Sequence, residues 1–300
     1  MISDSITSGI AVSALAYALF AVHDATIKFL VATLPVWQVL FFRSATILVA
    51  CLLAGRRHLL ERAAATPFKR ALVFRGLITL TAWLCYYTAA RSLPLAQLLS
   101  LYFAAPLLVT VLAAPLLGEH VTRARWGAVL VGFAGVLLAT DPFGVPASLP
   151  TLLVLIAAGL WGYGIILMRQ IARREPSTLQ MLAVNTTFLI ATGIACAFTW
   201  QPPTSMQFLL LLAVGVVGGV AQFCVFEGAR LAPAAVMATV EYTALIWAFI
   251  LGYAIWGDIP SAAVFLGAAF ILCAGALLLF SERRTARARI AELAVSEPRP

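Results

Sequence analysis

The sequence predicts an all-α membrane protein with ten transmembrane helices, arranged as two inverted five-helix repeats. Hydrophobic residues make up 63% of the 300 residues and charged residues only 11%, whereas soluble domains are about 45–50% apolar and about 25% charged. The apolar residues form runs of roughly the 20 residues that a membrane-spanning helix needs. A repeat relates the two halves of the chain. These features leave little sequence for a separate soluble domain.

The ten expected spans are separated by polar residues, Pro or Gly. Helices are expected throughout, because backbone groups in lipid must be hydrogen-bonded within their own segment. The first run lacks a preceding Lys or Arg, follows Asp4 and is too long for a signal peptide, so we take it as the first span. The expected ranges are 9–33, 36–54, 71–90, 95–117, 124–140, 150–169, 178–199, 206–227, 234–256 and 262–281.

The positive charges predict the orientation. If the amino terminus is cytoplasmic, all but three of the 20 Lys and Arg residues fall on the cytoplasmic side. The exceptions are Arg91 in an outer loop and Lys28 and Arg43 at membrane depth. The positive-inside rule therefore favours two cytoplasmic termini and an even number of spans. The net charge of +8 is attributed to these loops rather than to nucleic-acid binding.

An internal repeat divides the chain at about residue 143. An offset of 139 places the pattern R-x-x-P-x-A that begins at Arg91 over the one that begins at Arg230. The same offset places Gly118-Glu119 over Gly257-Asp258. We expect one repeat over 1–143, a second over 144–282 and a basic cytoplasmic tail over 283–300. Because five spans is an odd number, the second repeat must be inverted, which is typical of secondary transporters with a midplane substrate site.

The segment 90–138 also resembles a known family. Gly118-Glu119, the pair Trp126-Gly127 and the run Ala134–Leu138 are similar to the second part of an EamA-type repeat of the drug/metabolite transporter superfamily. The pair Phe42-Arg43 resembles the second helix of that repeat. The second copy departs from the pattern, since it has Gly257-Asp258 and no Arg equivalent to Arg43. The resemblance implies ten helices and export of metabolites, as in bacterial inner-membrane exporters of aromatic and other amino acids.

Ionisable residues inside the spans are the first candidates for a site, because each costs roughly 2.5–3.5 kcal/mol on insertion scales and usually faces a cavity or a partner. His23 and Asp24 are expected to line a substrate cavity or relay a proton. Lys28 follows Asp24 by one helical turn and can pair with it; a neutralised pair near the interface is the alternative. Arg43 needs a carboxylate partner, and Asp24 is the expected one; Arg43 then either holds the helices together or contacts the substrate. Glu241 has no basic neighbour, which suits a protonated, proton-coupling group or a hydrogen bond to another helix.

Aromatic side chains inside the spans are the second group of candidates. Trp83, Tyr102 and Trp161 are too deep for an interfacial belt, and the polar atoms of Trp and Tyr need partners when buried. They either line a cavity that holds the apolar part of a substrate or pack in the core. The candidates are Trp83, Tyr87, Tyr102, Trp161, Tyr163 and Tyr242.

The sequence lacks the G-x-x-x-x-G-K-[ST] pattern of an ATP-driven motor, and it suggests no cofactor and no metal site. We therefore expect a secondary transporter, not an enzyme, that exports small amphipathic metabolites across the bacterial inner membrane by alternating access. Amino acids, including aromatic ones, are the expected cargo, with protons as an optional coupling ion. The alternatives are export of another metabolite or drug class, a channel, and a membrane-embedded lipid-modifying enzyme.

Overall fold

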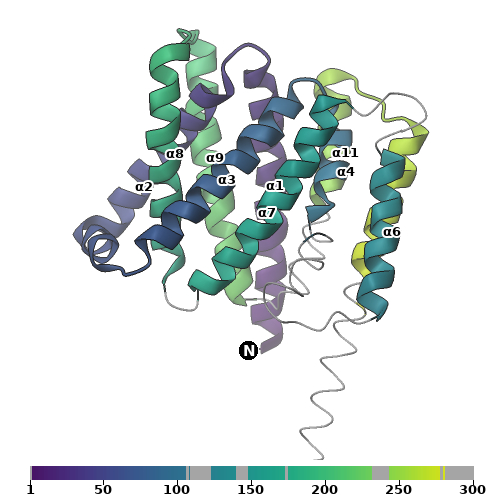
Figure 1. Cartoon of the computed structure of the whole chain (residues 1–300), viewed down its shortest axis with the longest axis horizontal. Coiled ribbons are helices and arrows are strands. Elements are labelled where there is room, and N and C mark those ends of the chain that lie inside the picture. Colours follow the sequence, from purple (N-terminus) through teal and green to yellow (C-terminus); the bar gives the residue numbers. More distant parts are fainter. Residues whose placement is uncertain are drawn as a thin grey trace, which may run out of the picture.

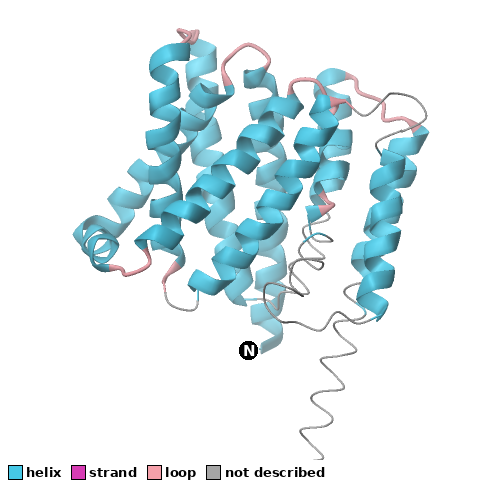
Figure 2. Ribbon diagram, viewed as in Figure 1, coloured by secondary structure: helices cyan, strands magenta, loops and turns pink. Residues whose placement is uncertain are grey.

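In the computed structural model, the described residues form helices joined by short loops, with no strand among them (Figure 2). The structure describes residues 2–105, 108, 123–139, 148–172, 175–231, 243–277 and 280. Its helices are α1 Ile2–Val31, α2 Val36–Ala65, α3 Lys69–Ala90, α4 Leu95–Tyr102, α6 Arg123–Ala139, α7 Leu149–Ala172, α8 Ser177–Thr199, α9 Ser205–Leu231 and α11 Thr243–Trp256. A further apolar helix spans Ala262–Leu277.

Five of these helices are long and apolar enough to cross a membrane. The qualifying stretches are Ala11–Val31, Val36–Leu53, Lys69–Ala90, Thr178–Thr199 and Ser205–Val225. Large apolar side chains also point outward, such as Leu53 at 76% exposed and Phe198 at 86%. An apolar surface of this kind suits lipid rather than water. The chain is a helical membrane protein; the count of ten spans stays a prediction.

Most helix boundaries follow the sequence. Pro35, Pro94 and Pro176 immediately precede α2, α4 and α8, where a missing N–H costs nothing because the first turn has no intrahelical acceptor. α11 ends at Trp256, and the next residue, Gly257, has a φ of 67°, the left-handed conformation that glycine adopts most easily. The Asp258 N–H then donates to the Gly252 carbonyl, 3.2 Å away, and this turn directs Asp258 back toward the bundle.

Two boundaries differ from the expected ones. α2 continues to Ala65, beyond the expected end at 54. The segment that follows the apolar stretch is polar and basic, but no proline interrupts the helix before Pro67. The span expected over 95–117 begins as α4 but turns at Phe103 and Ala104. Pro106 follows in the sequence, and a proline can make no hydrogen bond to the carbonyl four residues before it, here that of Tyr102, and its ring clashes with that carbonyl.

The two halves of the chain pack against each other through equivalent helices (Figure 1). α1 packs against α9, α3 against α7 and α2 against α8. By their order in each half, α1, α2 and α3 correspond to α7, α8 and α9. The contact of α1 with α9 is therefore equivalent to that of α7 with α3, and α2 packs against its own equivalent, α8. α6 lies beside the helix Ala262–Leu277, where a Cβ on Gly135 would stand 2.7 Å from the Gly267 carbonyl oxygen. The two halves therefore contribute equivalent helices to the contacts between them.

Candidate functional site

Asp24 is the centre of a polar cluster inside the bundle. Its Oδ1 accepts hydrogen bonds from the His23 Nδ1 at 3.0 Å and from the Tyr87 hydroxyl at 3.0 Å. Its Oδ2 accepts one from the Tyr86 hydroxyl at 3.4 Å. The His23 side chain is fully buried, while that of Asp24 is 19% exposed. The carboxyl group is therefore held by three donors, while about a fifth of the Asp24 side chain stays accessible.

Arg43 joins this cluster from α2. Its Nε donates to the His23 Nε2 at 3.1 Å, so Nε2 is the acceptor and Nδ1 must carry the proton that His23 donates to Asp24. The guanidinium carbon also lies 4.0 Å from the centre of the Trp83 ring, a cation–π contact. His23 thus stands as a neutral link between a cation and an anion. We call His23, Asp24, Arg43, Trp83, Tyr86 and Tyr87 the Asp24 cluster.

The helices α1, α2, α3 and α4 place Asp24, Arg43, Trp83 and Tyr102 at the same depth in the bundle. Asp24 and Trp83 each lie seven residues before the end of their helix, and Arg43 and Tyr102 each lie seven residues after the start of theirs. At 1.5 Å per residue, all four stand about 10 Å below the same end of the bundle. The polar groups are thus well inside the apolar layer, where unmatched charge is costly.

Gly218 on α9 lets the second half of the chain approach the cluster. A Cβ at this position would lie 2.7 Å from the His23 Cδ2 and 3.4 Å from the Arg43 Nε, so any side chain would displace the imidazole. Gly215 and Gly219 of the same helix face Thr46 and Ile47 of α2. Small residues permit this close helix packing.

Aromatic rings extend from the cluster toward α4 and α7. The contacts run from Trp83 to Tyr87, Tyr86, Tyr102 and Trp161, with ring centres 5.4, 5.2, 5.0 and 6.4 Å apart in that order. Trp83 also packs edge-on against Phe188 at 5.9 Å. Four expected aromatic residues are thereby brought together around the Asp24 cluster. A chain of such rings can hold the flat, apolar part of a small molecule.

Two of the expected charge pairs are wrong. Lys28 does not pair with Asp24, because the turn after α11 brings Asp258 to it: the Lys28 Nζ lies 3.6 Å from the Asp258 Oδ2 and donates to the Leu93 carbonyl at 2.7 Å. Its ammonium also lies 4.8 Å from the Trp256 ring centre. Arg43 is linked to Asp24 only through His23, because the imidazole lies between them. The His23 Nε2 accepts from the Arg43 Nε, and the His23 Nδ1 donates to Asp24.

The other candidates are placed differently. Tyr163 lies apart from the cluster, and its described ring contact is with Phe74, at 6.5 Å. Glu241 and Tyr242 lie outside the described residues. Tyr86 and Gly218 were not singled out by the sequence reasoning. The spacing of Tyr86 beside Tyr87 and the G-x-x-x-G pattern from Gly215 to Gly219 were the available signals.

A second polar cluster lies at the end of the bundle that holds the amino terminus (Figure 1). The Thr66 hydroxyl donates to the Glu175 Oε1 at 2.5 Å, and the Arg62 Nε lies 3.4 Å from Oε2. The Gln180 Nε2 donates to the Glu175 carbonyl oxygen, and its Oε1 accepts from Arg75. We call Arg62, Thr66, Glu175 and Gln180 the Glu175 cluster. It ties the α2–α3 loop to the loop before α8.

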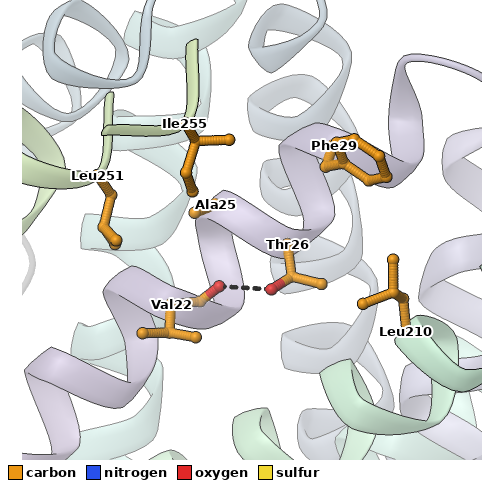
Figure 3. A pocket seen from close by; sticks show the side chains of 7 residues that line it. All are labelled: Val22, Ala25, Thr26, Phe29, Leu210, Leu251 and Ile255. Carbon is orange, nitrogen blue, oxygen red and sulfur yellow. Dashed lines mark hydrogen bonds between the residues drawn. The ribbon is translucent and has the colours of Figure 1, made fainter. Parts of the chain in front are cut away.

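A small groove between α1, α9 and α11 is a poor alternative site (Figure 3). Its volume is about 180 Å³, and its walls are apolar apart from the Thr26 hydroxyl, which donates to the Val22 carbonyl at 2.7 Å. Val22 and Phe29 are 45% and 53% exposed. The groove therefore lacks groups that would bind a charged metabolite and suits contact with lipid chains.

The chain belongs to the EamA-like transporter family, whose sequence profile matches residues 7–140 and again residues 149–280. The double match covers both halves of the chain. This membership makes the protein a multi-pass membrane transporter rather than an enzyme.

Several characterised relatives are transporters of small metabolites. The chain is 29% identical to the pseudopaline exporter CntI of Pseudomonas aeruginosa (strain UCBPP-PA14), over 91% of this chain and 96% of the relative. It is 28% identical to the riboflavin transporter of Vibrio cholerae, over 72% of each chain. It is 26% identical to the S-adenosylmethionine uptake transporter of Rickettsia prowazekii, over 88% of this chain and 90% of the relative. Transport of a small metabolite is their common property.

The fold also occurs in a solved crystal structure. The two structures superpose with a TM-score of 0.61 at 20% sequence identity, over 94% of this chain and 99% of the other. This likeness concerns the fold alone.

Proposed function

We propose that this chain exports small amphipathic metabolites, with aromatic amino acids foremost, across the bacterial inner membrane by alternating access. The observation that supports this cargo most strongly is the meeting of the Asp24 cluster with the row of aromatic rings. A zwitterion needs both signs of charge at its binding site, and the aromatic rings provide a surface for its apolar part.

Asp24 and His23 hold the charged end of the cargo in this proposal. The Asp24 side chain, which is 19% exposed, accepts a hydrogen bond from the ammonium group, and the His23 and Tyr87 donors keep the carboxyl group oriented. Trp83, Tyr87, Tyr102 and Trp161 receive the side chain. Aromatic amino acids therefore bind better than aliphatic ones of similar polarity.

The proposed movement follows from the repeat. The halves 1–143 and 144–282 rock against each other about the interface of α2 with α8, exposing the site to one side at a time. Both termini and the tail 283–300 are cytoplasmic in this scheme. The hydrogen bonds of Gln38 with the backbone of Gln201, and those of Glu175 with Thr66, join the halves at opposite ends of these two helices.

The proposal is tested by counterflow in liposomes that contain the purified chain. The liposomes are loaded with unlabelled tyrosine, leucine, riboflavin or S-adenosylmethionine, and uptake of labelled tyrosine is followed. We expect saturable exchange with tyrosine and weaker exchange with leucine. Failure of tyrosine-loaded liposomes to take up labelled tyrosine would contradict the amino-acid cargo, and flux that does not saturate would contradict alternating access.

The same assay with and without an imposed pH gradient examines proton coupling, for which Asp24 and Glu241 are the proposed carriers. A counterflow rate and a net export rate that are both independent of an imposed pH gradient would indicate uniport. Net export that is driven by the gradient would indicate proton exchange.

A further inference from the structure

Arg43 is a buried cation without an anionic partner among the described residues. It is 3% exposed, yet no described carboxylate lies within 4.0 Å of its guanidinium group. Its described contacts are the hydrogen bond from Nε to a neutral imidazole and the Trp83 ring against its face. A cation placed this deep is normally matched by a counter-charge or by a ligand.

The two contacts leave the carboxylate-binding edge of Arg43 unused. Nε–H is taken by His23 and one face of the plane by Trp83. Nη1 and Nη2 have no hydrogen-bond acceptor within the part of the chain that the structure describes. These two terminal groups form the planar fork that binds a carboxylate through two parallel hydrogen bonds.

Asp24 cannot serve as this anion, because His23 stands between the two charges. The imidazole accepts from Arg43 on one nitrogen and donates to Asp24 from the other. Tyr86 and Tyr87 also donate to the Asp24 carboxyl group. The cluster therefore presents separated positive and negative groups: Arg43 lies over the Trp83 ring, and Asp24 contacts Tyr87, whose ring centre is 5.4 Å from that of Trp83.

Arg75 provides a contrast. It is also buried, at 8% exposed, and its Nη1 donates to a neutral acceptor, the Gln180 Oε1. However, it lies eight residues before Trp83 on α3, about 12 Å along the helix axis from the Asp24 cluster. Among the described residues, no aromatic ring stacks on it.

We propose that Arg43 binds the carboxylate of the cargo and makes the transporter selective for amphipathic metabolites that carry this group. This inference rests on the proposed function and adds the chemical class that the site selects. The ammonium group, where the cargo has one, lies toward Asp24, and the apolar part lies along Trp83 and Tyr87.

The test is equilibrium binding of three labelled probes to the purified full chain. L-tyrosine carries both charged groups, tyramine lacks the carboxylate, and 3-(4-hydroxyphenyl)propionate lacks the ammonium group. Wild type should bind tyrosine and 3-(4-hydroxyphenyl)propionate, which carry the carboxylate, more tightly than it binds tyramine. In Arg43→Gln, the affinity for these two should fall by about tenfold to a hundredfold, while that for tyramine changes by less than about threefold.

Arg75→Gln is the matched control and should leave the ratio of tyrosine to tyramine affinity unchanged. Arg43→Lys provides the same test if Arg43→Gln does not fold, since it keeps the charge but loses the fork. Its tyrosine affinity should fall by about threefold to tenfold, without a change for tyramine.

Each outcome separates the inference from the proposed function. Equal affinity of wild type for tyrosine and tyramine would overturn the role of Arg43 and leave amino-acid export standing. The role of Arg43 would also be overturned if Arg43→Gln lowered the affinity for all three probes equally, because a purely structural role would have that effect. Wild type that binds none of the three would overturn the proposed cargo and the carboxylate site together.

Discussion

The Asp24 cluster and the Glu175 cluster are both polar groups at contacts between helices, but they are built differently. In the Glu175 cluster, the carboxylate meets the Thr66 hydroxyl and the Arg62 guanidinium group, and Arg62 is 56% exposed to the surroundings. In the Asp24 cluster, cation and anion are separated by His23, and aromatic rings surround them about 10 Å inside the bundle.

This difference separates a structural contact from a binding site. Side chains of the protein satisfy one another in the Glu175 cluster, so its effect is on how firmly two loops are joined. The Asp24 cluster leaves the terminal groups of Arg43 without an acceptor among the described residues, and the Asp24 side chain 19% exposed. Substitutions in the two clusters should therefore change different measurements.

Asp24→Asn should have the largest effect. It removes the negative charge that faces the ammonium group of the cargo and weakens the hydrogen bonds from His23 and the tyrosines. Hydrogen bonds to charged groups contribute about 1.5–3 kcal/mol, so tyrosine flux below saturation should fall by about a hundredfold. Asp258→Asn is the control, because Asp258 pairs with Lys28 at the end of the bundle; equal losses in both variants would contradict the assignment.

Gly218→Ala should have the next largest effect. The new Cβ would lie 2.7 Å from the His23 ring, and such overpacking costs about 1–3 kcal/mol. The free energy of unfolding in an SDS titration should fall, and tyrosine affinity should fall with it because His23 is displaced. Gly219→Ala is the control, because its new Cβ meets only the Ile47 side chain at 3.3 Å, and it should retain tyrosine binding. A larger loss of tyrosine affinity in Gly219→Ala than in Gly218→Ala would show that His23 does not need its present position.

Glu175→Ala should lower stability without changing the affinity for cargo. It leaves the Thr66 hydroxyl without its acceptor and Arg62 without its ion pair, which costs about 1–3 kcal/mol of unfolding free energy. Tyrosine binding to the folded fraction should stay within about twofold of wild type. A selective loss of affinity for tyrosine would remove the distinction between the clusters.

Arg62→Gln should have the smallest effect. Its ion pair with Glu175 is 3.4 Å long and more than half exposed on the arginine side. Exposed pairs contribute about 0–1 kcal/mol, so the midpoint of unfolding should hardly move. A loss as large as that of Glu175→Ala would mean that the ion pair, rather than the Thr66 hydrogen bond, holds the two loops together.

The sequence predicted the helical membrane fold well, because length and apolarity of a segment are local properties. Proline positions also marked the starts of α2, α4 and α8. The turn at Phe103 and Ala104 was missed, since the apolar run continues through it. The ten-span count, the repeat boundaries and the orientation remain predictions.

The site was predicted in composition but not in its connections. His23, Asp24, Arg43, Trp83, Tyr87, Tyr102 and Trp161 were all recognised as deep polar or aromatic residues, and they do meet. The partners were wrong where helix spacing alone was used: Asp24 and Lys28 are one turn apart, but Lys28 is closer to Asp258, a residue 230 positions away in the chain. Only the tertiary structure could show that His23 separates Arg43 from Asp24.

The most direct test of the central claim is to locate bound cargo. A crystal structure determined with 3-iodotyrosine would mark the ligand by the anomalous scattering of iodine. We predict that the iodine lies against Trp83, Tyr87 or Tyr102, with the amino-acid end between Asp24 and Arg43. A single iodine site in the apolar groove of Val22, Phe29 and Leu210, or beside Glu175, would contradict the assignment of the Asp24 cluster as the cargo site.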